Sequence, residues 1–277
     1  MHSQTKPPLI AELPAVERKS TASPFAVLAS FAVKWAIPLS LLAGLLAWDA
    51  LARLTGWPAY ILPRPLAVWN RFLAVTADGW LFWHASITLG EVLAGLALGL
   101  AVATALGYVV AKSVALERAL TPYIVASQAI PIVALAPLLV LWFGVGLRSK
   151  VLICALIVFF PILINTVVGL RSVEPDLRDL MRSLRATRWQ TFLKLEAPAA
   201  LPIWLGGLRV GATLAVIGAV VGEFVGADRG LGFLINFGRG QYDTALVFVA
   251  ALALVIIALL LYGAVSAVER ALLRWQR

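Results

Sequence analysis

The chain has 277 residues, of which 61% are hydrophobic and 13% are charged, and its mean hydropathy is +0.92. Soluble domains are about half apolar and about a quarter charged, so this composition excludes an ordinary soluble protein and favours a bilayer environment. The net charge of +9 does not indicate nucleic-acid binding, because the basic residues lie mostly beside and between apolar runs. One cysteine, Cys154, and two histidines, His2 and His84, exclude a disulfide framework and a Cys- or His-rich metal site within one chain.

The first 32 residues contain four prolines and mixed charges, and they predict a flexible tail at 1–32. The first apolar run begins too late for a secretory signal and no cleavage site follows it, so we interpret it as an uncleaved span. The remainder, 33–277, is expected to form one transmembrane domain.

Six apolar segments are long enough to cross a bilayer, which takes about 20 predominantly apolar residues. They are 33–52, 84–111, 119–143, 150–170, 201–226 and 244–266. The third contains Pro122, Pro131 and Pro137, so we expect it to be bent and packed against protein. The predicted fold class is therefore all-α: a polytopic membrane protein with about six transmembrane helices.

The distribution of Lys and Arg predicts that both termini are cytoplasmic, because most of the 23 basic residues then lie inside. Glycines also recur every four residues, which allows two helix backbones to approach closely, within the chain or between two copies. These glycines are Gly95, Gly99, Gly207, Gly211, Gly218, Gly222 and Gly226.

An amphipathic helix is predicted after Pro65. The apolar residues Leu66, Trp69, Phe72 and Leu73 follow at helix spacing. Such a helix lies at the membrane interface or packs against the bundle, and the residues alone do not choose between the two.

The one long polar insertion in the apolar core, 171–200, predicts a helix, a turn and a second helix on the cytoplasmic side. Pro175 suits a first helical turn, Thr187 can cap the second helix, and Pro198 and Pro202 are expected to end it. The first helix carries an apolar stripe, made of Leu177, Leu180, Met181 and Leu184.

Trp189 and Phe192 protrude from the second predicted helix, and aromatic anchors of this kind fit grooves on soluble partners. Attached to the fifth span, the helix would act as a lever. The alternative is a helix pair that lies on lipid headgroups.

This insertion resembles the cytoplasmic "EAA" loop of binding-protein-dependent ATP-binding-cassette (ABC) importer permeases. Asp179 stands at the acidic position, and Leu184, Arg185 and Ala186 stand at Leu-Gly-Ala. Leu180 and Met181 replace the two alanines, and Arg185 replaces a glycine that could adopt positive φ without strain. The residues that the resemblance assigns to ATPase coupling are Asp179, Leu184, Arg185, Ala186, Thr187, Trp189, Phe192 and Pro198.

Further stretches resemble the nitrate/sulfonate/taurine branch of these permeases, and the resemblance covers about 40–275. They are Leu62-Pro63-Arg64-Pro65, Pro137-Leu138, Leu141-Trp142-Phe143-Gly144-Val145-Gly146, Lys150, Phe159-Phe160-Pro161-Ile162, Asn165-Thr166, Gly222-Glu223-Phe224 and Gly230-Leu231-Gly232. The resemblance implies an inner-membrane permease dimer, of two identical or two different chains, surrounded by lipid. It also implies two cytoplasmic ATPase subunits and an extracytoplasmic solute-binding protein.

The sequence contains no catalytic constellation and no phosphate-binding Gly-x-x-x-x-Gly-Lys-Ser/Thr loop, so we expect neither an enzyme nor a cofactor in this chain. ATP is expected to be hydrolysed by a partner subunit. Polar residues at membrane depth are candidates for the translocation pathway, with a buried contact between helices as the alternative for each. These residues are Gln128, Asn165 and Glu223, and Asp49 and Glu91 share the same placement.

The resemblance implies a small anion such as a sulfonate, taurine or nitrate as the solute. The stretch Val221–Gly230 instead resembles relatives that carry pyrimidine or flavin vitamins, and both solute classes stay open. A secondary transporter or channel is the alternative function, which the lack of an internal repeat and the few intramembrane charges disfavour. A membrane-embedded enzyme would need a metal or nucleophile cluster that the sequence lacks.

Overall fold

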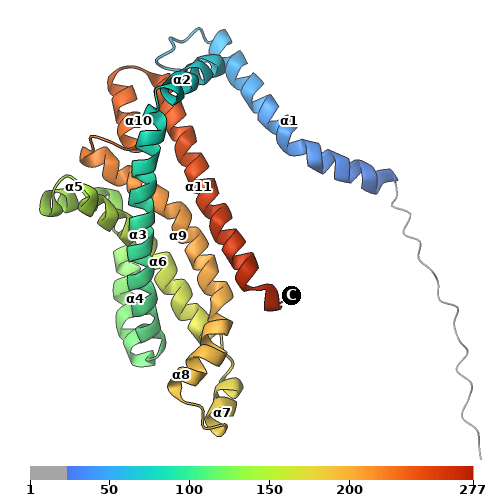
Figure 1. Cartoon of the computed structure of the whole chain (residues 1–277), viewed down its shortest axis with the longest axis vertical. Helices are drawn as coiled ribbons and strands as arrows, with labels where there is room; N and C mark the ends of the chain where they lie inside the picture. Colours follow the sequence, from blue (N-terminus) through green and yellow to red (C-terminus); the bar gives the residue numbers. More distant parts are fainter. Residues whose placement is uncertain (1–23, 277) are drawn as a thin grey trace, which may run out of the picture. The chain divides into compact units, whose positions relative to one another are not determined.

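The computed structural model describes residues 24–276, and these residues form helices and no strand (Figure 1). The elements are α1 (Pro24–Leu54), α2 (Pro65–Ala77), α3 (Trp80–Ala111), α4 (Val114–Gln128), α5 (Ile132–Phe143), α6 (Leu147–Arg171), α7 (Pro175–Ser183), α8 (Arg188–Thr191), the π-helix η1 (Phe192–Glu196), α9 (Ala197–Gly226), α10 (Leu231–Gly240), α11 (Thr244–Leu272) and the 3₁₀-helix η2 (Arg274–Gln276). Residues 1–23 of the predicted flexible tail lie outside the described residues. Most of α1 forms a unit by itself, and the other elements belong to a second unit, Ala52–Arg277.

The second unit is built on α3, α6 and α9, which pack along one another, with α11 against α9 (Figure 1). In the part of the chain that the structure describes, four helical stretches are long and apolar enough to cross a membrane. These stretches are Trp80–Ala111, Leu147–Arg171, Arg188–Gly226 and Thr244–Leu272. The second, fourth, fifth and sixth predicted spans correspond to these stretches.

The third predicted span is bent, as its prolines predict. Helices α4 and α5 are separated by a short break and meet at 92°. Pro131 stands at the break as the residue before α5, in extended backbone with ψ 112°. A proline cannot continue the hydrogen bonding of the preceding helix, so the chain turns there and begins a new helix. Counted as one span, this pair brings the apolar stretches to five.

The predicted close packing of glycines is confirmed within the chain. A Cβ on Gly218 of α9 would lie 2.7 Å from Cys154 Cα of α6, and one on Gly99 of α3 would lie 2.9 Å from the Ala155 carbonyl oxygen. Both contacts are with backbone, so α6 lies against its two neighbours at a distance that only glycine permits.

Helix α2 forms where the sequence predicts it, but a different face is packed. Val68 and Val75 are buried, whereas Leu66 and Trp69 of the predicted apolar stripe are 62% and 56% exposed. Arg71 Nε donates to Asp243 Oδ2 at 2.8 Å, which fastens α2 to the residue that caps α11. The helix therefore packs on the bundle through its valines and keeps an exposed apolar face, which suits a membrane interface.

The prediction that Pro198 and Pro202 end the second helix of the 171–200 loop is wrong. From Arg188 the helix runs on through η1 into α9 and continues to Gly226. Pro198 lies in the first turn of α9, directly after the π-helical turn Phe192–Glu196. A π-turn widens the backbone locally and accommodates the missing N–H of proline, so the helix continues instead of stopping.

Candidate functional site

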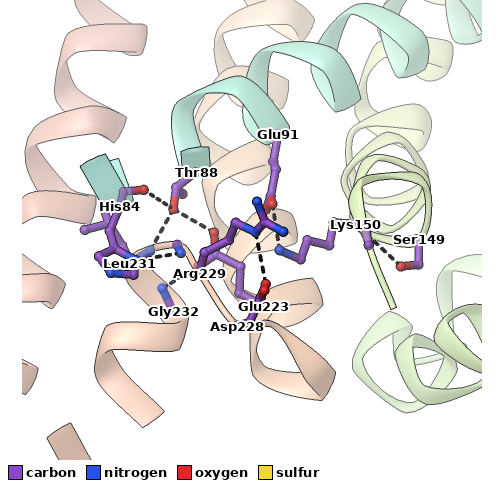
Figure 2. Close-up of polar contacts among 12 residues, drawn as sticks. His84, Thr88, Glu91, Ser149, Lys150, Glu223, Asp228, Arg229, Leu231 and Gly232 are labelled. Carbon is purple, nitrogen blue, oxygen red and sulfur yellow. Dashed lines mark hydrogen bonds and ion pairs between the residues drawn. The ribbon is translucent and has the colours of Figure 1, made fainter. Parts of the chain in front are cut away.

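A buried polar cluster lies at one end of the bundle and begins on α3. His84, Thr88 and Glu91 are spaced i, i+4, i+7, so they share one face of α3, and none is more than 3% exposed (Figure 2). The face points toward α6, α9 and the start of α10, which supply the partners.

Backbone amides at the start of α10 bind this face. Gly230 N–H donates to His84 Nδ1 at 2.9 Å, and Leu231 N–H donates to Thr88 Oγ1 at 2.8 Å. The Thr88 hydroxyl donates to Glu223 Oε1 at 2.6 Å, and Glu223 accepts a further hydrogen bond from the Gly232 N–H (Figure 2). Amides at the N-terminus of a helix favour a negatively charged partner, so Glu223 holds α10 in place from inside the bundle.

Gly230 at this junction has φ +110°, a conformation that L side chains rarely adopt, and Glu223 fills the space where a Cβ would stand. Packing therefore explains why glycine occupies position 230, which the resemblance also identifies: any side chain there would overlap the Glu223 carboxyl group.

A buried ion pair extends the cluster to α6. Lys150 Nζ donates to Glu91 Oε1 at 2.7 Å, and the two side chains are only 5% and 3% exposed. Because Glu91 lies on the same face of α3 as His84 and Thr88, the cluster extends along that face from His84 to Lys150. The network ties α3, α6, α9 and α10 together at one end of the membrane-spanning bundle.

A cavity of about 640 Å³ adjoins the ion pair and is lined by both Glu91 and Lys150. Asp228 and Arg229 also line it, and Arg229 Nε donates to Asp228 Oδ1 at 3.0 Å (Figure 2). That hydrogen bond lowers the pKa of the exposed Asp228 carboxyl, so this group at the rim is a carboxylate near neutral pH.

The three residues predicted for the translocation pathway do not come together. Glu223 is 1% exposed and lies inside the network, and Asn165 is half-buried, with its Nδ2 donating to the Pro161 carbonyl at 2.7 Å. Gln128 is exposed at the end of α4, and its Nε2 donates to the Ile124 carbonyl of its own helix at 3.4 Å. Their role in a pathway stays a prediction.

The second polar region lies at the opposite end of the bundle, where α7 and α8 project (Figure 1). Thr187 caps α8 as predicted: its hydroxyl accepts from Gln190 N–H at 3.2 Å, while Thr187 N–H donates to Gln190 Oε1 at 2.8 Å. Trp189 is 66% exposed and stacks on Phe192, with ring centroids 5.7 Å apart. Phe192 in turn contacts the Tyr108 ring of α3 at 5.3 Å.

The other residues that resemblance assigns to coupling are mostly at the surface. Leu184 is 67% exposed, and Asp179 accepts a hydrogen bond from Arg182 of the same helix at 2.7 Å. Ala186 and Pro198 are half-buried. With Leu177, Leu180 and Trp189, Leu184 gives α7 and α8 an exposed apolar surface, which we call the α7–α8 surface.

Arg185 has the positive φ expected at this turn. Its φ is +50°, and the surrounding hydrogen bonds close a Schellman motif after α7. Ala186 N–H donates to the Met181 carbonyl at 3.0 Å, and Arg185 N–H donates to the Arg182 carbonyl at 2.9 Å. The turn keeps its glycine-type geometry although arginine occupies it.

Replacing Arg185 with glycine is expected to raise the free energy of unfolding by about 1 kcal/mol, because glycine adopts this φ without the strain that arginine carries. Chemical denaturation of the purified chain in detergent measures the change. The control Ser183→Gly, in the last helical turn of α7, is expected to lower stability by about 0.5–1 kcal/mol. A destabilised Arg185→Gly protein would contradict the strained turn.

Ion pairs and a hydrogen bond join the 171–200 loop to the bundle, and the sequence does not indicate them. Lys112 Nζ, at the end of α3, binds both carboxylate oxygens of Glu196 at 2.7 and 2.5 Å, and Arg171 binds Glu117. Arg178 Nη2 donates to the Leu170 carbonyl at 2.7 Å. The loop is therefore joined to α3 and α6 as well as to α9.

The sequence assigns no role to His84 beyond its count against a metal site. The spacing of His84, Thr88 and Glu91 is the signal that could have found the cluster, because three polar residues on one face of an apolar helix are costly unless partnered.

The fold, with four helical stretches long and apolar enough to cross a bilayer in its described part, is that of an all-helical, multi-pass membrane protein. Solved inward-facing structures of the MetNI methionine ABC transporter share this fold, with a TM-score of 0.57 over 69% of this chain and 94% of that chain, at 22% sequence identity. Residues 95–274 match the family described as the binding-protein-dependent transport system inner membrane component. The chain belongs to that family and is the permease subunit of an ABC importer in the inner membrane.

Named relatives extend over most of the chain. The riboflavin transport system permease RibX of Chloroflexus aurantiacus is 50% identical over 87% of this chain and 90% of its own length. The formylaminopyrimidine transport permease ThiX of Halalkalibacterium halodurans is 39% identical over 83% and 91%. The taurine permease TauC of Escherichia coli is 31% identical over 88% and 94%. These relatives are transport permeases rather than enzymes, which favours transport over the enzymatic alternative.

Proposed function

We propose that the α7–α8 surface docks on a cytoplasmic ATPase subunit and passes its motion to the membrane helices. The observation that supports this proposal is the uninterrupted helix from Arg188 to Gly226, because a helix held at one end by a partner moves as one body. The exposed Trp189 and Leu184 supply the apolar anchors that a groove on the partner would bury.

The same helix reaches the buried cluster at the opposite end. Glu223 lies near the end of α9 and holds the start of α10 through its hydrogen bonds with Thr88 and Gly232. A tilt of α9 driven from Trp189 would therefore act on Glu223 and on the 227–232 segment. In this proposal, ATP-driven motion at Trp189 would reach the buried cluster at the opposite end of the bundle.

Trp189→Ala, and separately Ala186→Asp, are expected to reduce co-purification with the ATPase and to abolish uptake, while both proteins still insert in the membrane. The loss of the central aromatic anchor at an interface typically costs 2 kcal/mol or more, about thirtyfold in affinity. Trp142→Ala is the matched control, because Trp142 on α5 is 68% exposed and Trp189 is 66% exposed. If Trp189→Ala and Ala186→Asp both retained wild-type uptake, the proposal that the α7–α8 surface transmits motion from the ATPase would be wrong.

We propose six spans, with α1 as the first and the α4–α5 pair as the third, and with both termini in the cytoplasm. Two copies of the chain, or this chain and a related one, would pair around the pathway. ATP would be hydrolysed by the partner subunits, and an extracytoplasmic binding protein would deliver the solute.

We infer that the solute is a flavin- or pyrimidine-type heterocycle rather than a sulfonate. The relatives named for riboflavin and formylaminopyrimidine are more similar to this chain than the one named for taurine. The stretch Val221–Gly230, which resembles the vitamin-type relatives, contains Glu223 of the buried cluster and Arg229 at its rim.

Uptake of radiolabelled riboflavin, formylaminopyrimidine and taurine tests this choice in cells that lack their own systems and express the chain with its ATPase and binding protein. Accumulation of riboflavin or the pyrimidine, but not of taurine, is expected. Uptake of taurine alone would reverse the assignment and leave the coupling proposal intact.

A further inference from the structure

A basic pocket and an apolar cleft meet between the bundle and the α7–α8 surface. The basic pocket has a volume of about 700 Å³ and is lined by Lys112, Arg178, Arg182 and Arg188, with Glu196 as its acidic residue. Lys112 is already paired with Glu196 and Arg182 with Asp179, so Arg178 and Arg188 leave the pocket with an excess of positive charge.

The apolar cleft has a volume of about 580 Å³ and runs along the last two turns of α3, between α6, η1 and α9. Three of its polar side chains are engaged within the bundle: Trp204 Nε1 donates to Thr104 Oγ1 at 3.0 Å, and Thr166 Oγ1 donates to the Ile162 carbonyl at 2.7 Å. The lining therefore offers almost only hydrocarbon surface, and a hydrocarbon chain is its natural occupant.

Tyr108 lines both hollows and joins them. Its ring contacts Phe192 at 5.3 Å on the side of the cleft, and Lys112 Nζ lies 5.2 Å from its centroid on the side of the pocket. Lys112 is the C-cap of α3, so the basic pocket begins where the membrane-spanning helix ends. Aromatic residues at this depth mark the membrane–water interface.

We propose that these joined hollows bind one anionic phospholipid, with a fatty-acyl chain in the apolar cleft and the headgroup phosphate among Arg178, Arg182 and Arg188. The arrangement matches the amphiphile in both parts: hydrocarbon lies within the span, and positive charge lies just beyond its end. Basic pockets beside membrane helices attract anionic headgroups in this way. An acidic segment of the ATPase would use the arginines but would leave the apolar cleft unfilled.

Such a lipid would bridge α3, α6 and α9 to the loop that projects from them. It would hold α8 and η1 against the bundle next to the Lys112–Glu196 pair, and anionic lipid would therefore favour one position of the α7–α8 surface. Lipid binding at this site would not depend on which solute the permease carries.

Native mass spectrometry of the purified full-length chain in detergent, titrated with phosphatidylglycerol, phosphatidylcholine or glycerol 3-phosphate, tests the site. Phosphatidylglycerol is expected to bind more tightly than either of the others. Arg188→Gln should weaken its binding about fivefold. Ala105→Phe, which fills the cleft from an exposed position of α3, should weaken phosphatidylglycerol but leave glycerol 3-phosphate unchanged.

Two matched controls accompany these variants. Arg148→Gln removes an exposed arginine at the opposite end of α6, and Ala94→Phe adds a ring at an exposed position of α3 away from the cleft. Both should bind phosphatidylglycerol as the wild type does. Equal binding of phosphatidylcholine, or glycerol 3-phosphate binding as tightly as phosphatidylglycerol, would overturn the proposal. So would an Arg188→Gln chain that keeps its lipid but no longer binds the ATPase, since the arginines would then belong to that interface.

Discussion

Replacing Lys150 with methionine is expected to lower the free energy of unfolding by about 3–5 kcal/mol, because it leaves the Glu91 carboxyl buried without its cation. Glu91 is 3% exposed and cannot recover its hydration, and the neighbouring Glu223 carboxyl adds a second acid to the same site. Thermal or chemical unfolding of the purified chain in detergent measures the loss.

The double variant Lys150→Met, Glu91→Leu separates the ion pair from simple packing. Removing both partners of a buried pair is often neutral or stabilising, so the double variant should recover most of the loss. If Lys150→Met alone unfolded like the wild type, the pair would not hold α3 to α6.

Gly218→Val is the second substitution with a large expected effect. A Cβ at Gly218 would lie 2.7 Å from Cys154 Cα, and a backbone atom cannot move aside as a side-chain end can. Overpacking costs about 1–3 kcal/mol and more where backbone is displaced, so we expect little folded protein.

Gly206→Val on the same helix is the matched control, because a Cβ there would meet nothing within 4 Å. Fluorescence-detected size-exclusion chromatography should show a monodisperse peak for Gly206→Val and an aggregated or depleted one for Gly218→Val. Equal peaks for the two variants would contradict the close approach of α6 and α9.

Patterns along the chain were enough to predict four of the six apolar spans, a bend in the third predicted span and the close glycine packing. Each of these rests on local chemistry: the number of consecutive apolar residues, a missing backbone N–H, or the absence of a Cβ. The positive φ of Arg185 was predictable in the same way, through the glycine that the resemblance places there.

Contacts between residues far apart in the chain were not predictable from those patterns. Lys150 and Glu91 are 59 positions apart, and Lys112 and Glu196 are 84 apart. Their pairing depends on the register in which α3 packs against α6 and η1, which no single segment specifies. The continuation of α9 through Pro198 was missed for another reason, because a π-turn that accommodates proline has no simple sequence pattern.

For Glu223, its position in the sequence and its contacts in the structure give complementary information. Its position near the end of an apolar helix predicted a polar group with a purpose, either lining a pathway or joining helices. The structure gives it Thr88 and Gly232 as partners and buries it, which describes its contacts but leaves its part in transport to experiment.

The location of Trp189 relative to the membrane tests the central claim most directly. In a Cys154→Ala background, Trp189→Cys and Arg229→Cys place single thiols at opposite ends of the bundle, and a membrane-impermeant maleimide reports which side each one faces. We expect Arg229→Cys to react in intact cells and Trp189→Cys to react only after the membrane is permeabilised. Reaction of Trp189→Cys in intact cells would put the α7–α8 surface outside the cell, where no ATPase could reach it.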